Sequence, residues 1–209
     1  MTRLIVWRHG NTDWNAANRV QGQTDVPLNE RGRDQARAAA PLLAALRPDA
    51  IVASDLSRAA ETAAALAALT GLPVHADARL RERHFGQWQG LHLTEVAERF
   101  PEEYARWRAG DPDPGTDLEP LRDLGERVGA ALQEAADAAP GGTVVLATHG
   151  GASRQGIGHL LGWDTTVLRT IGSLANCHWS ELRHDDRRGW QLRAHNVGLI
   201  TAPVAVDAI

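Results

Sequence analysis

Lysine is absent from this chain of 209 residues, and all 22 of its basic residues are arginines. The absence excludes Schiff-base lysines, the lysine of a phosphate-binding P-loop, and serine–lysine catalytic pairs. Cysteine occurs once, as Cys177, so neither an intrachain disulfide nor a cysteine-based zinc cluster can form. A single thiol is typical of proteins in a reducing compartment, and we expect a cytoplasmic location.

Long hydrophobic runs are also missing, since no stretch of about 18 apolar residues occurs. The short apolar run at residues 4–7 stops at Arg8 and lacks the features of a signal peptide. A formal net charge of −4 argues against general nucleic-acid binding. The histidines show no H-E-x-x-H spacing. We therefore expect no membrane or nucleic-acid partner, no metal and no cofactor.

Three continuous apolar runs, at residues 4–7, 50–53 and 143–148, predict strands that are covered on both faces, as in a parallel sheet. A hairpin is predicted near the C-terminus, from residues 174–182 and 190–195, because a polar, glycine-containing turn separates them.

Helical patterns lie between these strands. We expect helices over about residues 30–46, 56–69, 121–139 and 151–161, and a further one that starts at Thr94 and is interrupted at Pro101. Pro41 predicts a kink or break in the first helix, and Asn29 a cap. The alternation predicts a three-layer α/β/α sandwich with a mostly parallel central sheet. We expect one domain over residues 1–209, with residues of about 82–120 as a cap or lid.

Two of the predicted strands end in histidine, at His9 and at His149. Ligands of open α/β sheets bind beyond the carboxyl ends of the strands, so both side chains are expected in one crevice. The helix that follows His149 offers backbone N–H donors to an anion. Arg58 falls in the first turn of a helix, where a cation is unfavourable unless an anion compensates. Together with Arg8 it suggests a bound anion.

Glu82, in a loop, is the natural proton donor of this set. Guanidinium groups clamp phosphoryl oxygens, a neutral imidazole is a competent nucleophile, and a carboxylic acid can protonate a leaving alkoxide. Such a set needs no metal, because the arginines already supply positive charge. Attack through Nε2 of His9 requires that its Nδ1–H be held, and we expect a backbone carbonyl to do so.

At these residues the sequence resembles the histidine phosphatase superfamily, the phosphoglycerate-mutase-like proteins. Residues 4–15 (LIVWRHGNTDWN) resemble the family's Arg-His-Gly signature, and residues 54–62 (SDLSRAAET) its second arginine block. Residues 80–83 (LRER), with the glycines that follow, resemble the general-acid block, and residues 148–151 (THGG) the second histidine block. All the blocks occur in the family's order.

The resemblance implies a phosphatase with specific residue roles. His9 would be the nucleophile and carry the phosphoryl group as phosphohistidine. Arg8, Arg58 and His149 would bind that group, and Glu82 would protonate the leaving oxygen and then activate water. Residues assigned to phosphate or substrate binding are Asn15, Gln21, Gly22, Gly150 and Arg83. The expected partner is a small phosphorylated metabolite, and a homodimer is an expectation because family members often form dimers.

Alternative functions stay open at this point. The mutase branch of the family carries a longer insertion with lysine and paired arginines, whereas residues 111–117 here are short and acidic, which favours a phosphatase. Residues 82–86 (ERHFG) are nevertheless similar to the corresponding motif of the mutase branch. A non-catalytic phosphate-binding module and a phosphoprotein phosphatase are further alternatives. Residues 86–91 (GQWQGL) and 176–179 (NCHW) are similar to bacterial sugar-phosphoglycerate phosphatases.

Overall fold

The computed structural model describes residues 1–115 and 117–199. Within them, a six-stranded sheet has the order β3-β2-β4-β1-β5-β6. Strands β1 to β4 pair in parallel, whereas β5 and β6 are antiparallel at one edge. The mostly parallel sheet is thus confirmed. The strands are β1 (Arg3–Arg8), β2 (Ala50–Ala53), β3 (Val74–Ala76), β4 (Thr143–Thr148), β5 (Trp179–Asp185) and β6 (Gly189–Val197).

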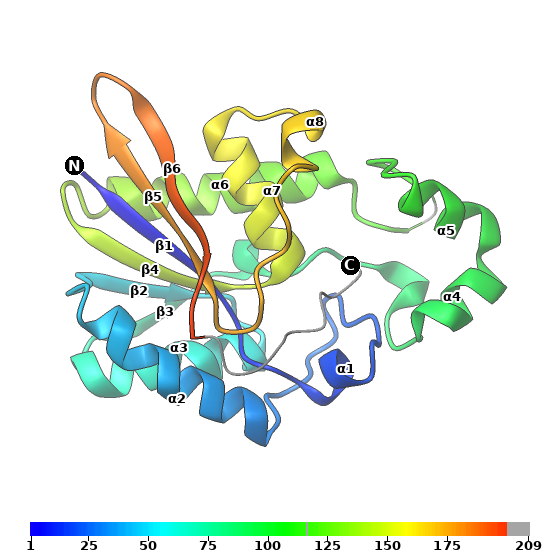
Figure 1. Ribbon diagram of the computed structural model, residues 1–209, viewed down its shortest axis with the longest axis horizontal. Coiled ribbons are helices and arrows are strands. Elements are labelled where there is room, and N and C mark those ends of the chain that lie inside the picture. Colours follow the sequence, from blue (N-terminus) through cyan, green and yellow to red (C-terminus); the bar gives the residue numbers. More distant parts are fainter. Residues whose placement is uncertain (116, 200–209) are drawn as a thin grey trace.

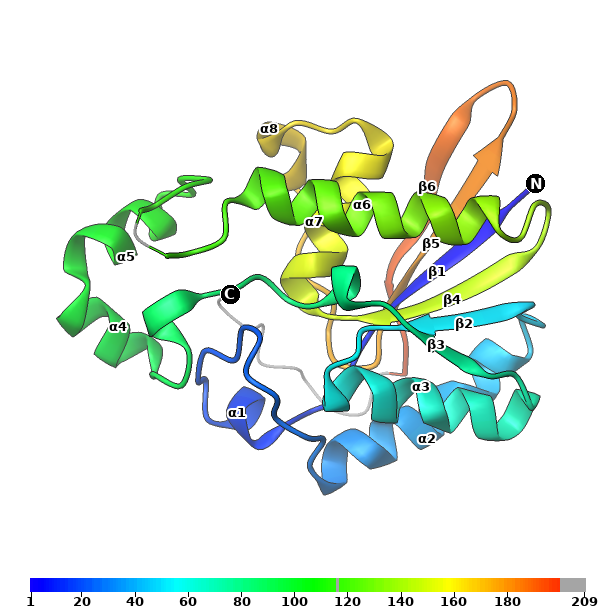
Figure 2. The ribbon, with the colours of Figure 1, turned by 180° about the vertical axis from the view of Figure 1, so that it is seen from behind.

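Helices cover both faces of the sheet (Figures 1 and 2). Helices α2 (Glu30–Ala44) and α3 (Ser57–Thr70) lie on one face, and α6 (Leu121–Asp137) and α7 (Gly150–Leu161) on the other. The shorter helices are α1 (Asp13–Ala16), α4 (Leu93–Arg99), α5 (Pro101–Arg108) and α8 (Thr165–Leu168), and two 3₁₀ turns are η1 (Ala78–Leu80) and η2 (Gly86–Trp88). None of the helices in the described residues combines the length and apolarity needed to cross a bilayer.

The position of β1 between two helical layers explains why the apolar run at residues 4–7 has no polar residue. Ile5 and Trp7 pack against α2 and α3, while Leu4 and Val6 pack into the cluster under α6 and α7. All four side chains are fully buried. Since successive strand residues point to opposite faces, a strand between two helical layers needs hydrophobic residues throughout.

Helix α2 begins where the sequence predicts, because Asn29 accepts a hydrogen bond from the Gly32 N–H. The break expected at Pro41 is wrong. The proline lies in the last turn, where only one helical hydrogen bond is lost, and its carbonyl still accepts from the Ala45 N–H. The helix therefore continues to Ala44.

The hairpin begins later than predicted. Residues 174–178 form a loop that returns to the C-terminal end of β1, and β5 starts at Trp179. The leucine at position 174 is buried in that loop, so its hydrophobicity does not mark a strand. Strand β3 was not predicted from the sequence, because it has only three residues and two of them are exposed.

A third apolar cluster lies away from the sheet, and all its buried members except Val20 belong to residues 82–120, here termed the cap segment. Trp88 is its centre and is almost fully buried. Its ring lies 5.9 Å from that of Trp107 and 6.4 Å from that of Tyr104, measured between centroids. Trp88 is thus a packing residue, and helices α4 and α5 project beyond the sheet on this side (Figure 1).

Candidate active site

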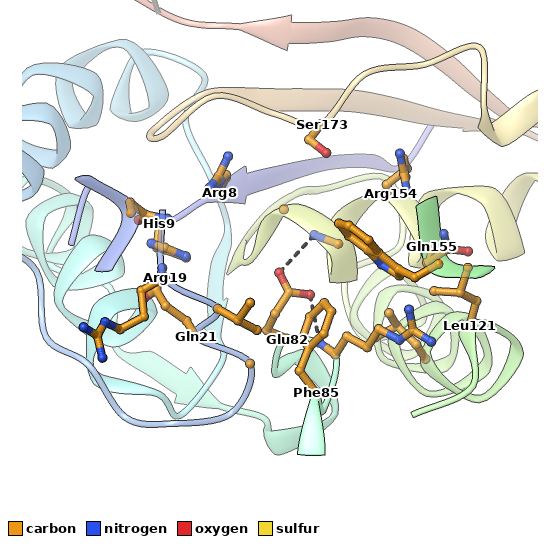
Figure 3. A pocket seen from close by; sticks show the side chains of 18 of the residues that line it. Arg8, His9, Arg19, Gln21, Glu82, Phe85, Leu121, Arg154, Gln155 and Ser173 are labelled. Carbon is orange, nitrogen blue, oxygen red and sulfur yellow. Dashed lines mark hydrogen bonds between the residues drawn. The ribbon is translucent and has the colours of Figure 1, made fainter. Parts of the chain in front are cut away.

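A cavity of about 290 Å³ opens at the carboxyl ends of the parallel strands (Figure 3). Its lining brings together nine of the ten residues that the sequence analysis assigned to the site, which are Arg8, His9, Asn15, Gln21, Gly22, Arg58, Glu82, Arg83 and Gly150. The exception is His149, which lies beside His9 and outside the cavity lining, with the two ring centroids 5.1 Å apart.

The imidazole ring of His9 is oriented as an attack through its Nε2 atom requires. Its Nδ1 lies 2.7 Å from the carbonyl oxygen of Gly10, which fixes the proton on Nδ1 and leaves the Nε2 lone pair free. The ring is buried, and burial together with the charges of Arg58 and Arg8 lowers the pKa of His9 well below its ordinary value. The imidazole is therefore neutral at pH 7, and the expected backbone partner is confirmed.

Arg58 is fully buried at the start of α3, as predicted from its place in the sequence. Its Nη2 donates to the carbonyl oxygen of Gly22 at 2.7 Å and its Nη1 to that of Thr24 at 2.9 Å. Burial lowers the pKa of Arg58 to about 10, so the guanidinium stays charged at pH 7. Gly22 has a φ of +54°, a conformation that favours glycine, and so presents its carbonyl to Arg58.

His149 has both ring nitrogens engaged. Nδ1 accepts from Nε of Arg58 at 3.2 Å, so Nε2 carries the proton and donates to Oγ of Ser54 at 2.9 Å. Burial, followed by the charge of Arg58, lowers the pKa of His149 well below its ordinary value. A neutral ring thus positions Arg58, and direct contact of His149 with a phosphoryl group stays a prediction.

Glu82 binds the N-terminus of α7. Its Oε1 accepts from the N–H groups of Arg83 and Ala152, each at 2.8 Å, and its Oε2 accepts from the Gly151 N–H at 3.0 Å. Two of the backbone donors after His149 that sequence analysis assigned to an anion are therefore bound by this carboxylate, and their contact with a phosphate stays a prediction. A side chain at Gly151 would place Cβ 2.7 Å from Oε1, so any larger residue there must displace the carboxylate of Glu82.

The other predicted ligands have defined neighbours. Oδ1 of Asn15 accepts from Thr12, and its Nδ2, which donates to no described residue, is the group available to a phosphate oxygen. Gln21 accepts from Thr12 as well. Arg83 is buried and donates to the carbonyl oxygen of Glu119 at 2.6 Å, so part of its role is structural.

Sequence reasoning missed several residues that hold the site. Arg127 of α6 donates to the carbonyl oxygens of residues 79, 81 and 82, and so fixes the loop that carries Glu82. Asn176 donates to the carbonyl oxygen of His9 at 3.0 Å. Ser54 and Arg154 were also unassigned. In an arginine-rich chain, nothing marks a residue whose partners are backbone carbonyls.

Metal-ligating side chains do not gather anywhere in the described part of the chain. No group of three or more histidine, cysteine, aspartate or glutamate side chains there has a geometry that could hold a metal ion.

Comparisons with known proteins agree with this geometry. The sequence model of the histidine phosphatase superfamily (branch 1) matches residues 4–198. A glucosyl-3-phosphoglycerate phosphatase of Mycolicibacterium vanbaalenii is 38% identical over 187 residues, which cover 86% of this chain and 83% of the relative. A metal-independent phosphoserine phosphatase of Arabidopsis thaliana is 40% identical over 159 residues, or 74% of this chain and 66% of the relative. A solved structure of a mycobacterial glucosyl-3-phosphoglycerate phosphatase with VO3 superposes with a TM-score of 0.87 at 36% identity, covering 94% and 99% of the two chains.

Proposed function

Because the chain belongs to branch 1 of the histidine phosphatase superfamily and is a phosphomonoesterase, we propose that it hydrolyses small phosphomonoesters through a phosphohistidine on His9. The observation that carries this proposal is the 2.7 Å contact between Nδ1 of His9 and the Gly10 carbonyl oxygen. This contact leaves Nε2 of His9 as the nucleophilic atom, and it lies in a buried site that contains Arg8 and Arg58.

In the first step, Nε2 of His9 attacks phosphorus and the bond to the leaving oxygen breaks. Arg8 and Arg58 neutralise the charge on the non-bridging oxygens in the transition state, and Asn15 donates a further hydrogen bond. In the second step, water attacks phosphorus, the N–P bond breaks, and inorganic phosphate leaves with His9 neutral again.

Glu82 moves the proton in both steps. Its Oε1 already accepts two N–H donors and its Oε2 accepts one. Oε2 therefore has the lone pair that can carry the proton, which it gives to the leaving oxygen and takes back from the attacking water. The half-buried carboxylate lies at the centre of the cavity (Figure 3).

The relatives favour a substrate that is a small phosphorylated metabolite. Those reported above are named for glucosyl-3-phosphoglycerate and for phosphoserine. Both compounds are phosphomonoesters of small hydroxy acids, and we propose a substrate of this size for the present chain. The second candidate, a phosphoglycerate mutase, is less favoured, since residues 111–117 carry no lysine and no arginine pair.

Phosphate release from a panel of esters, measured in EDTA, tests the proposal. The panel contains p-nitrophenyl phosphate, 3-phosphoglycerate, glucosyl-3-phosphoglycerate and phosphoserine, and His9→Ala is the control variant. We expect turnover that survives EDTA and disappears with His9→Ala, and an acid-labile phosphoenzyme on rapid quenching. Absence of release from every ester, with interconversion of 3- and 2-phosphoglycerate after priming by a bisphosphoglycerate, would instead identify a mutase.

Three further expectations belong to the proposal. The cap segment supplies the outer wall of the cavity through Phe85 and Trp107, which supports its role as a cap within a single domain. Residue 116 of its loop and residues 200–209 lie outside the described residues. Strand β6, at an edge of the sheet, offers a surface for a homodimer. The buried, reduced Cys177 supports a cytoplasmic location.

A further inference from the structure

Arg154 is a cavity residue whose side chain forms no hydrogen bond or ion pair within residues 1–115 and 117–199. It projects from α7, five residues after His149, and lines the cavity beside Gln155 and Ser173 (Figure 3). Its Nε–H is buried and donates to none of the described residues, and no ion pair joins its guanidinium to them. Burial lowers the pKa of Arg154, with only the charge of Glu82 opposing the effect.

Three other arginines of the cavity wall differ in this respect. Arg58 donates to two backbone carbonyls, Arg83 to the Glu119 carbonyl, and Arg19 to the Gly90 carbonyl. Their guanidinium groups are fixed by the chain itself. A half-buried guanidinium without partners is destabilising, because the charge and its donors lose water without compensation. Such a group in a cavity wall is suited to an anionic ligand.

The position of Arg154 indicates which part of a ligand it meets. In Figure 3, His9 and Arg154 lie on opposite sides of Glu82. A phosphoryl group on His9, with its leaving oxygen at Glu82, therefore directs the leaving group toward Arg154. The phosphoryl oxygens themselves are on the other side, with Arg8 and Arg58.

The charge of the lining supports a second anion. Six arginines line the cavity, against two carboxylates, those of Glu82 and Asp111. Apolar side chains also line the cavity, and one of them, Leu121, lies on the Arg154 side (Figure 3). A small organic acid fits this combination, because a planar guanidinium binds a carboxylate through two parallel hydrogen bonds.

We propose that Arg154 binds a carboxylate on the leaving group and so selects phosphomonoesters of small hydroxy acids. This inference rests on the proposed phosphatase function and adds to it a specificity-determining residue.

A pair of substrates tests the assignment directly. 3-Phosphoglycerate and glycerol 3-phosphate differ in that a carboxylate replaces a hydroxymethyl group, and the ratio of their kcat/KM values measures recognition of the carboxylate. We expect the protein to prefer 3-phosphoglycerate. Arg154→Gln should lower that ratio about 10- to 100-fold, mainly through a higher KM for 3-phosphoglycerate, as expected when a charge-assisted hydrogen bond is lost.

Arg187→Gln is the matched control. Arg187 is exposed in the turn between β5 and β6, which lies beside the amino end of β1 and so at the opposite end of the sheet from the cavity, and its substitution removes the same charge. The ratio of kcat/KM values for the two esters should be the same in Arg187→Gln as in the unmodified protein. This control distinguishes direct binding of the carboxylate from long-range electrostatic attraction. Arg154→Lys keeps the positive charge but lacks the planar guanidinium, so it should give an intermediate ratio. It also replaces Arg154→Gln as the test variant if the latter does not fold.

Two results would overturn the inference. If Arg154→Gln and Arg154→Lys both retain the full ratio, or lower kcat/KM equally for the two esters, Arg154 does not recognise the carboxylate. Turnover of p-nitrophenyl phosphate in these experiments shows that the phosphatase function holds even when the Arg154 assignment fails. Absence of turnover with all three esters would refute both proposals.

Discussion

Arg127 and Glu119 are joined by two hydrogen bonds, 2.6 Å from Nε to Oε1 and 2.8 Å from Nη2 to Oε2. The same guanidinium donates to the carbonyl oxygen of Glu82 at 2.8 Å. Glu119 in turn accepts from the backbone N–H of His84. One half-buried ion pair, between Arg127 of α6 and Glu119 just before this helix, thus holds the backbone on both sides of Glu82, the proposed general acid.

Arg127→Met is therefore expected to impair proton transfer more than phosphoryl binding. Because a shift of about 1 Å in a catalytic group can cost 100-fold in rate, we expect kcat for alkyl phosphates to fall about 10- to 100-fold. p-Nitrophenyl phosphate, whose leaving oxygen needs no proton, should lose much less. Arg122→Met, an exposed arginine on the same helix, should change neither rate. Equal losses on both ester types would show that Arg127 acts only through stability.

Gly151→Ala tests the position of the acid from the other side. The new Cβ would lie 2.7 Å from Oε1 of Glu82, so the carboxylate must move away from the start of α7. Leaving-group discrimination should change as in Arg127→Met, while KM for p-nitrophenyl phosphate stays within about two-fold. Gly172→Ala, where a Cβ meets no atom within 4 Å, is the control. Unchanged alkyl phosphate turnover in Gly151→Ala would contradict the role of Glu82.

Arg58→Ala should weaken the binding of inorganic phosphate and vanadate. A charge-assisted hydrogen bond contributes about 1.5–3 kcal/mol, so inhibition constants should rise about 10- to 100-fold. Arg37→Ala removes an exposed arginine from α2 and should leave both constants unchanged. Competitive inhibition of p-nitrophenyl phosphate hydrolysis measures these constants, and equal affinity in Arg58→Ala would remove this residue from the phosphate site.

Stability should fall as the pH is lowered below about 6.5, the ordinary pKa of histidine. The pKa values of His9 and His149 are both lowered in the folded protein, chiefly by burial. Below pH 6.5 the unfolded chain binds protons that the folded chain does not, so each histidine contributes a slope of up to about 1.4 kcal/mol per pH unit. Above that pH, the two histidines contribute no slope.

Urea unfolding at pH 7.5 and pH 5.5 measures this effect. His9→Asn should reduce the difference between the two pH values, because one of the two groups is removed. For the same reason, the acid limb of kcat/KM should lie below pH 6.5, since His9 stays neutral down to its lowered pKa. If His9→Asn keeps the full difference in the free energy of unfolding between the two pH values, His9 does not contribute to that difference.

Sequence patterns predicted the central parallel strands, and they placed two residues of the predicted site at the ends of those strands. The continuous apolar runs of β1 and β4 predict buried parallel strands, and this places His9 and His149 together at their ends. The predicted start of the hairpin was wrong, because the buried leucine at position 174 belongs to a loop and not to a strand. Hydrophobicity reports burial, and only tertiary contacts decide between a strand and a buried loop.

The supporting residues could not be predicted in the same way. Arg127 binds backbone carbonyls, which every residue has, so its partners leave no pattern in the sequence. Arg154 is recognisable by the lack of a partner, which is visible only once the cavity wall is known. The placement of His149 outside the lining also depends on three-dimensional contacts with Arg58 and Ser54.

The double attachment of Arg127 has a consequence for how specificity can change in this fold. Both ends of the segment between Glu82 and Glu119 bind the single side chain of Arg127, whereas the residues predicted to bind phosphate, apart from Arg83, come from elsewhere in the chain. The intervening stretch can therefore be exchanged as one graft. A chimera that keeps Arg127, Glu82 and Glu119 should retain the phosphoryl chemistry and the carboxylate recognition proposed for Arg154 of α7, whereas the outer wall of its cavity would follow the donor.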